Sequence, residues 1–262
     1  MTPVAFDIAF EVAAILLTLA IILRTFPMIK NGNNPMAAAL FLFSMVSVML
    51  SFAYWLAYTI MRPDIRMPFA ANEIGEIAWF LLLASALETV FRERKAPARK
   101  ETIFTLIFAA ASVALWIGWS GEWIQDIICG LAFGYFLCTC VRSLKQTDAF
   151  KQTDWRILGL FCGAIILGQA GTFFVPEGFK KPLDYFCYGL MFASLIWLFA
   201  KSILTAKNNK DTKAVLAMSF TVSAYSFSTM YMSSGWFYLA GLLICLATQP
   251  LMLHALKREV GA

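Results

Sequence analysis

Residues 36–61 read MAAALFLFSMVSVMLSFAYWLAYTIM, a run of 26 residues that contains no Asp, Glu, Lys or Arg. A helix of about 20 apolar residues is long enough to cross the hydrocarbon core of a bilayer. Similar apolar stretches recur from Val4 to Leu256 and are separated by short polar clusters. Hydrophobic residues make up 60% of the 262-residue chain and charged residues only 14%, whereas soluble domains have about 25% charged residues. The sequence therefore predicts a multi-pass membrane protein.

We expect an all-α, polytopic integral membrane bundle of nine transmembrane helices. Only helices and closed barrels satisfy their backbone hydrogen bonds inside a bilayer, and the alternating ten-residue segments of a barrel are absent. The apolar residues 214–256 are too many for one span, and Ser233-Ser234-Gly235 predicts a turn between two helices. The predicted spans are Val4–Phe26, Met36–Met61, Pro68–Phe91, Thr102–Gly118, Ile124–Val141, Ile157–Val175, Leu183–Leu204, Ala214–Met232 and Trp236–Leu256.

The basic residues predict the orientation of these spans. With the N-terminus outside, the cytoplasmic segments hold 17 of the 21 Lys and Arg residues, which is the asymmetry that membrane proteins show. The outer segments keep only four basic residues but nine of the sixteen acids. We therefore expect the N-terminus outside and the C-terminus in the cytoplasm, in a bacterial plasma membrane. The basic loops then contact anionic lipid rather than nucleic acid.

Several functional classes lack the residues that they require. His254 is the single histidine, and the six cysteines show neither a CxxC motif nor a Cys/His pair at metal-ligand spacing. A Gly-x-Ser-x-Gly elbow and a Walker loop are also missing. We expect no enzymatic activity, no metal and no cofactor. Residues 1–262 are interpreted as a single transmembrane domain without a soluble output domain.

Polar and aromatic side chains gather in the first three predicted helices, towards the outer leaflet. Ionisable groups inside a span are unfavourable and mark functional sites. Residues three or four apart share one face of a helix, which groups the acids and aromatic rings of this region. The candidate ligand-binding residues are Asp7, Glu11, Tyr54, Trp55, Tyr58, Arg62, Arg66, Asn72, Glu73, Glu76 and Trp79.

Two interpretations of this cluster are open. In the functional one, an arginine binds an anionic group, the carboxylates bind an amine or a proton, and the aromatic rings provide stacking or cation–π contacts. In the structural one, the acids cap helix N-termini and pair with the arginines at the wet interface. Glu73 fits the structural interpretation better, whereas Asp7, Glu11 and Glu76 lie deeper and favour a function.

Hydroxyl side chains surround the eighth predicted helix on every face, which contact with lipid would not favour. This helix is either enclosed by other helices or lines a polar path. In an enclosed helix, Ser and Thr hydroxyls bond to carbonyls one turn back.

Two further patterns concern helix packing. Lys201 lies at the inner end of its helix, so we expect its ammonium to extend to the membrane surface. Glycines occur four residues apart, Gly130 with Gly134 and Gly159 with Gly163. Such pairs of small residues predict close approach between membrane helices.

The pattern as a whole favours a small-solute transporter or permease, with an acidic outer vestibule and carboxylates available for proton coupling. The alternative is a ligand-binding sensor or accessory subunit that acts through a cytoplasmic or membrane partner protein. In both cases the protein lies in the lipid bilayer and binds a small polar or zwitterionic ligand. Transport of a solute would distinguish the two.

Overall fold

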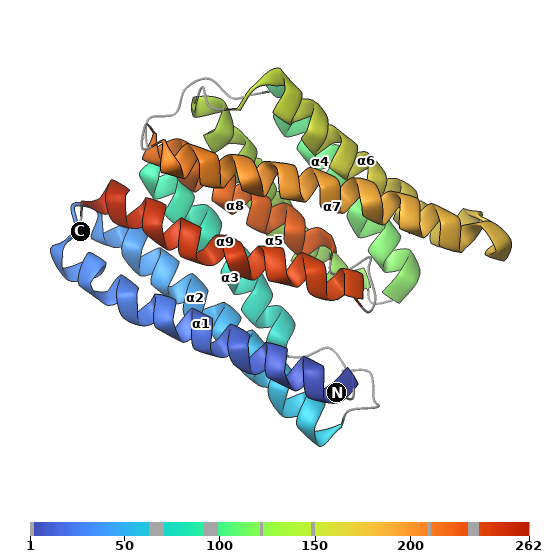
Figure 1. The fold of residues 1–262 in the computed structure, drawn as a ribbon, viewed down its shortest axis with the longest axis horizontal. Helices are drawn as coiled ribbons and strands as arrows, with labels where there is room; N and C mark the ends of the chain where they lie inside the picture. The colour runs from blue at the N-terminus through green and yellow to red at the C-terminus, as the bar shows by residue number, and fades with distance from the viewer. Residues whose placement is uncertain are drawn as a thin grey trace. The chain divides into compact units, whose positions relative to one another are not determined.

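The computed structural model describes residues 3–62, 71–91, 99–120, 123–147, 150–208, 211–229 and 236–261. In these segments the chain forms nine α-helices and no strand, as the apolar sequence predicts (Figure 1). The helices are α1 (Pro3–Asn31), α2 (Pro35–Met61), α3 (Ala71–Val90), α4 (Arg99–Ser120), α5 (Trp123–Gln146), α6 (Gln152–Phe174), α7 (Glu177–Lys207), α8 (Thr212–Ser228) and α9 (Trp236–Val260).

Seven of these helices are long and apolar enough to cross a membrane, which is the composition of a multi-pass membrane protein. The other two described helices are α3 and α8. α3 carries three glutamates in 20 residues, and α8 has only 17 residues. A helix of this length is about 25 Å long, slightly shorter than a hydrocarbon core of about 30 Å. Both helices therefore depend on neighbouring helices to enclose their polar groups.

Local capping residues explain where α2 and α8 begin. The Asn34 side chain accepts a hydrogen bond from the Ala37 N–H at 3.2 Å, and Asp211 accepts one from Ala214 at 3.0 Å. Such side chains satisfy backbone donors that the first helical turn leaves unpaired. Pro35 follows Asn34 at the first turn, where its missing N–H is not needed. Both helices therefore begin within two residues of their predicted spans.

Two prolines do not interrupt the helices in which they occur, although the predicted spans end or begin beside them. α1 continues past Pro27 to Asn31, and α7 begins at Glu177, before Pro182. A proline removes a single N–H donor. A membrane helix tolerates this loss, because nearby groups bond to the backbone group that is left free. Both helices therefore extend beyond their apolar cores.

The chain divides into two compact units, and the first consists of Met1–Arg92 together with Leu256–Ala262. In this unit α1 and α3 both pack against α2. The end of α9 lies beside the turn between α1 and α2 (Figure 1). There the Asn33 N–H donates a hydrogen bond of 2.7 Å to the Val260 carbonyl. The first unit is therefore a helical bundle that the last residues of the chain complete at one end.

The second unit, Glu93–Ala255, encloses α8. Every side chain from Ala214 to Ser228 is buried, and α8 packs against both α5 and α7. The Ser223 oxygen and the Cys245 sulfur, on α9, lie 3.4 Å apart. The hydroxyls that donate to a carbonyl three or four residues earlier are those of Ser219, Thr221, Ser226, Ser228 and Thr229. The enclosed-helix interpretation is thus confirmed for the described part of α8.

Close helix approach is confirmed for one of the two glycine pairs. A Cβ on Gly134 would lie 3.3 Å from the nearest side chain of α4, and one on Gly130 would overlap Val113. Among the described residues, an added Cβ on Gly159 or Gly163 would meet no atom of another element within 4 Å. α5 therefore fits closely against α4, whereas these glycines of α6 border open space.

Candidate functional site

Glu11 lies on α1 within the predicted cluster and has only 5% of its surface exposed. It faces α2, where the Thr59 hydroxyl donates a hydrogen bond of 3.2 Å to Glu11 Oε1. The other carboxylate oxygen, Oε2, is buried and has no hydrogen-bond partner among the described residues. An ionised carboxylate can accept about four hydrogen bonds. One oxygen of Glu11 therefore keeps unused hydrogen-bonding capacity inside the protein.

The aromatic residues of the predicted cluster that lie on α2 occupy its last turns. Trp55 precedes Thr59 by one turn and shares its helix face. The Tyr54 and Tyr58 rings stack, with their centroids 6.4 Å apart, and all three aromatic side chains are half-buried. The Arg62 N–H ends the helix by donating to the Tyr58 carbonyl at 2.8 Å, and its side chain is exposed. This end of α2 presents aromatic surface near the contact between α1 and α2.

Glu76, on α3, lies beside a different part of α2 from Glu11. A Cβ on its neighbour Gly75 would lie 2.8 Å from a carbonyl oxygen of α2 and 3.2 Å from Ser51 Cβ, so the two helices touch here. Glu76 is buried, with 7% of its surface exposed. Ser51 precedes Thr59 by eight residues, which corresponds to about 12 Å along α2. The structure thus places Glu11 and Glu76 at different levels rather than at one point.

The remaining predicted site residues differ in how they are placed. Trp79 is completely buried and contributes to the core of the first unit. Asp7 and Glu73 are half-buried. Arg66 lies outside the described residues, as does the side chain of Asn72.

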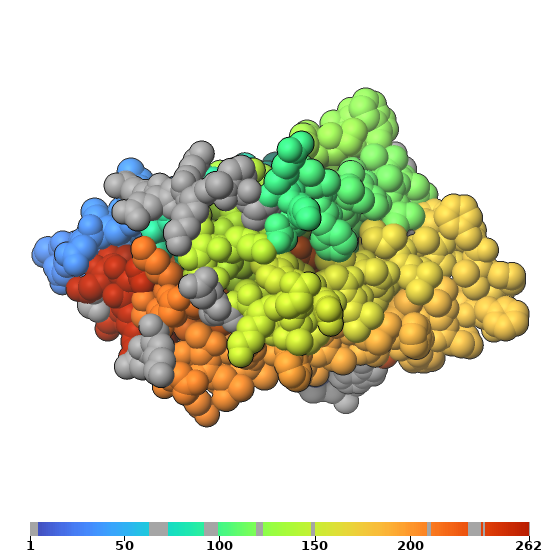
Figure 2. Space-filling view, turned by 90° about the horizontal axis from the view of Figure 1, so that it is seen from above, coloured from blue at the N-terminus to red at the C-terminus, as the bar shows by residue number. Residues whose placement is uncertain are grey.

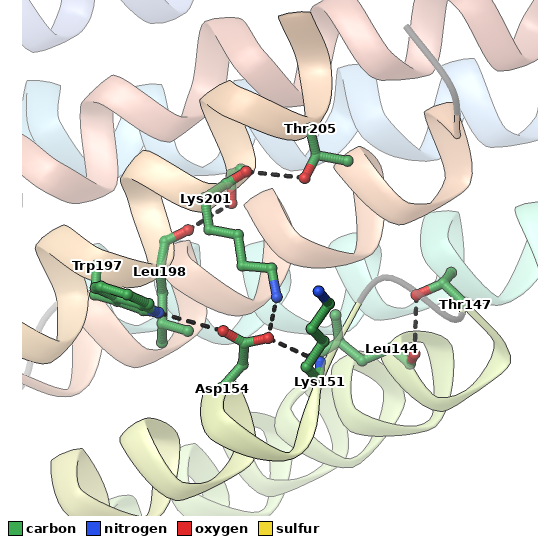
Figure 3. Close-up of polar contacts among 9 residues, drawn as sticks. Leu144, Thr147, Lys151, Asp154, Trp197, Leu198, Lys201 and Thr205 are labelled. Atoms are coloured by element: carbon green, nitrogen blue, oxygen red, sulfur yellow. Dashed lines mark hydrogen bonds and ion pairs between the residues drawn. The ribbon is translucent and has the colours of Figure 1, made fainter. Parts of the chain in front are cut away.

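A second polar centre, which the sequence pattern did not indicate, lies in the second unit (Figure 3). Asp154, in the first turn of α6, is 1% exposed. Its carboxylate forms an ion pair with the Lys201 ammonium of α7. It also accepts hydrogen bonds from Trp197 Nε1 at 3.2 Å and from the Lys151 backbone N–H at 2.8 Å. A cation and two further donors therefore compensate this buried charge.

The expectation that Lys201 extends to the membrane surface did not include a partner for its ammonium. Figure 3 shows its side chain directed at Asp154. The reason is that the attraction between opposite charges is much stronger beside a buried carboxylate than in water. One signal in the sequence could have found the pair. Asp154 and Lys201 are about equally far from the turn that joins α6 to α7, so antiparallel packing brings both charges to one level.

Aromatic rings extend this centre towards α4 and α5. The Lys201 ammonium lies 5.4 Å from the centroid of Phe150, which meets the Trp155 ring edge-on at 4.9 Å. The Lys145 ammonium of α5 lies 5.2 Å from the Trp155 centroid and forms an ion pair with Glu101 of α4. These contacts connect the ends of four helices, α4 to α7.

Both polar centres are built from carboxylates, hydroxyls and ammonium groups. The described residues contain no group of three or more His, Cys, Asp or Glu side chains that could hold a metal ion. All six cysteines are buried and free, as small apolar side chains would be. No protein-family model, no curated protein and no solved structure matches this sequence.

Proposed function

We propose that the chain crosses a bacterial plasma membrane nine times, with its N-terminus outside and its C-terminus in the cytoplasm. The charge distribution supports this topology, because 17 of the 21 basic residues then face the cytoplasm. The hydrogen bond from Asn33 to Val260 also supports it, since it joins the turn after Lys30 to the end of α9, which carries Lys257 and Arg258. In the second unit, the ion pairs of α4 with α5 and of α6 with α7 lie at helix ends assigned to the cytoplasm.

Topology reporters test this arrangement. Reporters fused after Lys100 and at the C-terminus should both read cytoplasmic, and one fused after Gly235 should read external. If α3 and α8 did not cross the membrane, the reporter after Lys100 would read external while the C-terminus stayed cytoplasmic. That result would contradict nine spans and indicate seven.

We further propose that the protein is a small-solute transporter rather than an enzyme, with Glu11 binding the coupling proton or the amine of a zwitterionic or cationic solute. One observation carries this proposal. Glu11 is buried between α1 and α2, with one oxygen bonded to Thr59 and the other without a described partner. An uncompensated charge in an apolar medium is unfavourable, which favours a bound proton or cation. The stacked Tyr54 and Tyr58 rings offer cation–π contact nearby.

Uptake into proteoliposomes tests the transport function. From a panel of amino acids, betaines and small amines, we expect at least one solute to accumulate faster under a pH gradient. Glu11→Gln should abolish the gradient-driven accumulation, because an amide cannot exchange a proton. Thr59→Val should weaken the apparent affinity roughly tenfold, since a hydrogen bond to a charged group contributes about 1.5–3 kcal/mol.

Thr89→Val is the matched control. The Thr89 hydroxyl donates only to carbonyls of its own helix, at 2.8 Å and 2.9 Å, and its side chain is half-buried like that of Thr59. This variant should transport at the parent rate. Unchanged gradient-driven uptake by Glu11→Gln would contradict the site. A solute that raises thermal stability while none of the panel is taken up would favour a ligand-binding sensor.

A further inference from the structure

A cavity of about 280 Å³ opens between α4 and α6 in the second unit and extends inwards to α8. Figure 2 shows a hollow between the green helix α4 and the yellow-green helix α6, with orange-red atoms at its bottom. None of the residues predicted for the outer cluster lines this cavity. An apolar cavity of about 150 Å³ can bind benzene, so this one has room for a ring and a short chain.

The inner end of the cavity is formed by a buried phenol. Tyr225 of α8 is 0% exposed, and its ring packs against Phe108 and Phe161 with centroids 5.8 Å and 5.6 Å away. Its hydroxyl lies near the Thr105 hydroxyl and the Cys162 thiol but forms no hydrogen bond of ordinary geometry with the described residues. A buried polar atom without a partner costs about 1–3 kcal/mol. Thr105 lines the same end and already donates to the Glu101 carbonyl at 2.8 Å, which leaves its oxygen as an acceptor.

The middle of the cavity is apolar. Its walls include Phe104 of α4, Val141 of α5 and Leu158 of α6. Gly159 also lines it, and a Cβ added there would meet no described atom of another element within 4 Å. The space beside Gly159 is therefore not a close helix contact but part of the cavity.

The outer end of the cavity carries a positive charge. Glu101 and Trp155 line it, and both contact the Lys145 ammonium, so the charge of Glu101 is compensated. Lys100 lies beside Glu101, is exposed, and forms no ion pair with the described residues. Gln152 adds an exposed amide. The combination of an ammonium and an amide is suited to a carboxylate or phosphate group.

We propose that this cavity binds a small anionic amphiphile, with its carboxylate or phosphate at Lys100, its apolar body along Phe104 and Leu158, and a polar atom at the Tyr225 hydroxyl. Lys100 precedes Thr105 by five residues, so the charged and hydroxyl-lined ends lie about 7.5 Å apart along α4. An aryl acid with a distal hydroxyl matches this order of groups. The same head-group chemistry can come from water, as an organic acid, or from the bilayer, as a lipid.

Two probes distinguish these sources, with binding to the full-length protein in nanodiscs measured by calorimetry. The water-soluble probe is para-hydroxyphenylpropionate, and the membrane probe is oleoyl lysophosphatidate added to phosphatidylcholine nanodiscs. We expect saturable binding of at least one probe. Binding of only the soluble acid assigns the ligand to water, and binding of only the lysolipid assigns it to the membrane.

Filling the cavity should remove the binding. Gly159→Leu should raise the Kd of the bound probe roughly tenfold or more, because the new side chain occupies the space beside Leu158. Gly163→Leu is the matched control, since it lies one turn further on α6 with equally open surroundings and does not line the cavity. It makes the same change in helix propensity and should leave the Kd unchanged.

A second variant tests the inner end. Tyr225→Phe keeps the ring packing and should raise the Kd of para-hydroxyphenylpropionate roughly fivefold, while the Kd of phenylpropionate, which lacks the hydroxyl, stays the same. Failure of both probes to bind saturably would overturn the proposal. Equal Kd values for Gly159→Leu and Gly163→Leu would overturn it as well.

Discussion

We expect Lys201→Met to lower the free energy of unfolding by about 3–5 kcal/mol, because removal of one partner leaves a buried charge uncompensated. Asp154 is 1% exposed, and the Lys201 ammonium is its only ion-pair partner among the described residues. The measurement is reversible unfolding of the detergent-solubilised protein. Lys207→Met is the matched control, since Lys207 is exposed in the last turn of the same helix. Its loss should change the free energy by at most about 1 kcal/mol.

The double variant Asp154→Asn/Lys201→Met separates the buried charge from lost packing. An asparagine at 154 is neutral and keeps one acceptor oxygen, which can accept from either Trp197 or the Lys151 N–H, so part of the lost stability should return. If Lys201→Met destabilised the protein no more than Lys207→Met, the ion pair would not stabilise this end of the bundle. If the double variant were as unstable as Lys201→Met alone, lost packing rather than the charge would be the cause.

The helical architecture could be predicted because a long apolar run has few alternatives in a bilayer. Each predicted span overlaps one of the nine described helices. Helix ends were predicted well where a capping side chain marks them, as Asn34 does before α2. They were predicted poorly at Pro27 and Pro182, because a single missing donor does not end a helix whose other backbone groups stay bonded.

The candidate site in the first unit could be predicted only in part. Spacing placed Asp7 and Glu11 on one face of α1, but it does not reveal which residue of α2 faces them. The bond from Thr59 depends on how α1 and α2 are aligned. The contact of α3 with α2 at Gly75 then places Glu76 beside another part of α2 than Glu11, although both were assigned to one outer cluster.

The second unit contains features that no local pattern reveals. The pairing of Asp154 with Lys201 joins residues 47 positions apart and requires α6 and α7 to pack at one register. Gly130 and Gly159 belong to identical spacing patterns, yet one contacts Val113 and the other borders a cavity. Small residues permit close approach, but the neighbouring helix determines whether it occurs.

Substitution of Gly75 should also lower the free energy of unfolding strongly, because α2 and α3 touch at this residue. A Cβ on Gly75 would lie 2.8 Å from the Ser47 carbonyl oxygen. A backbone oxygen cannot move aside as the end of a side chain can, so Gly75→Leu must push the two helices apart. Overpacking of this kind costs about 1–3 kcal/mol, and the longer leucine side chain should place the loss near the upper value.

Gly163→Leu is again the control, because it introduces the same side chain into open surroundings. Replacing a helical glycine by leucine there should be neutral or stabilise the helix by up to about 1 kcal/mol. The difference between the two variants, measured by unfolding in the same detergent, therefore isolates the contact between α2 and α3. Equal stabilities would show that the two helices do not approach closely at Gly75. They would also remove the basis for placing Glu76 about 12 Å from the level of Thr59 along α2.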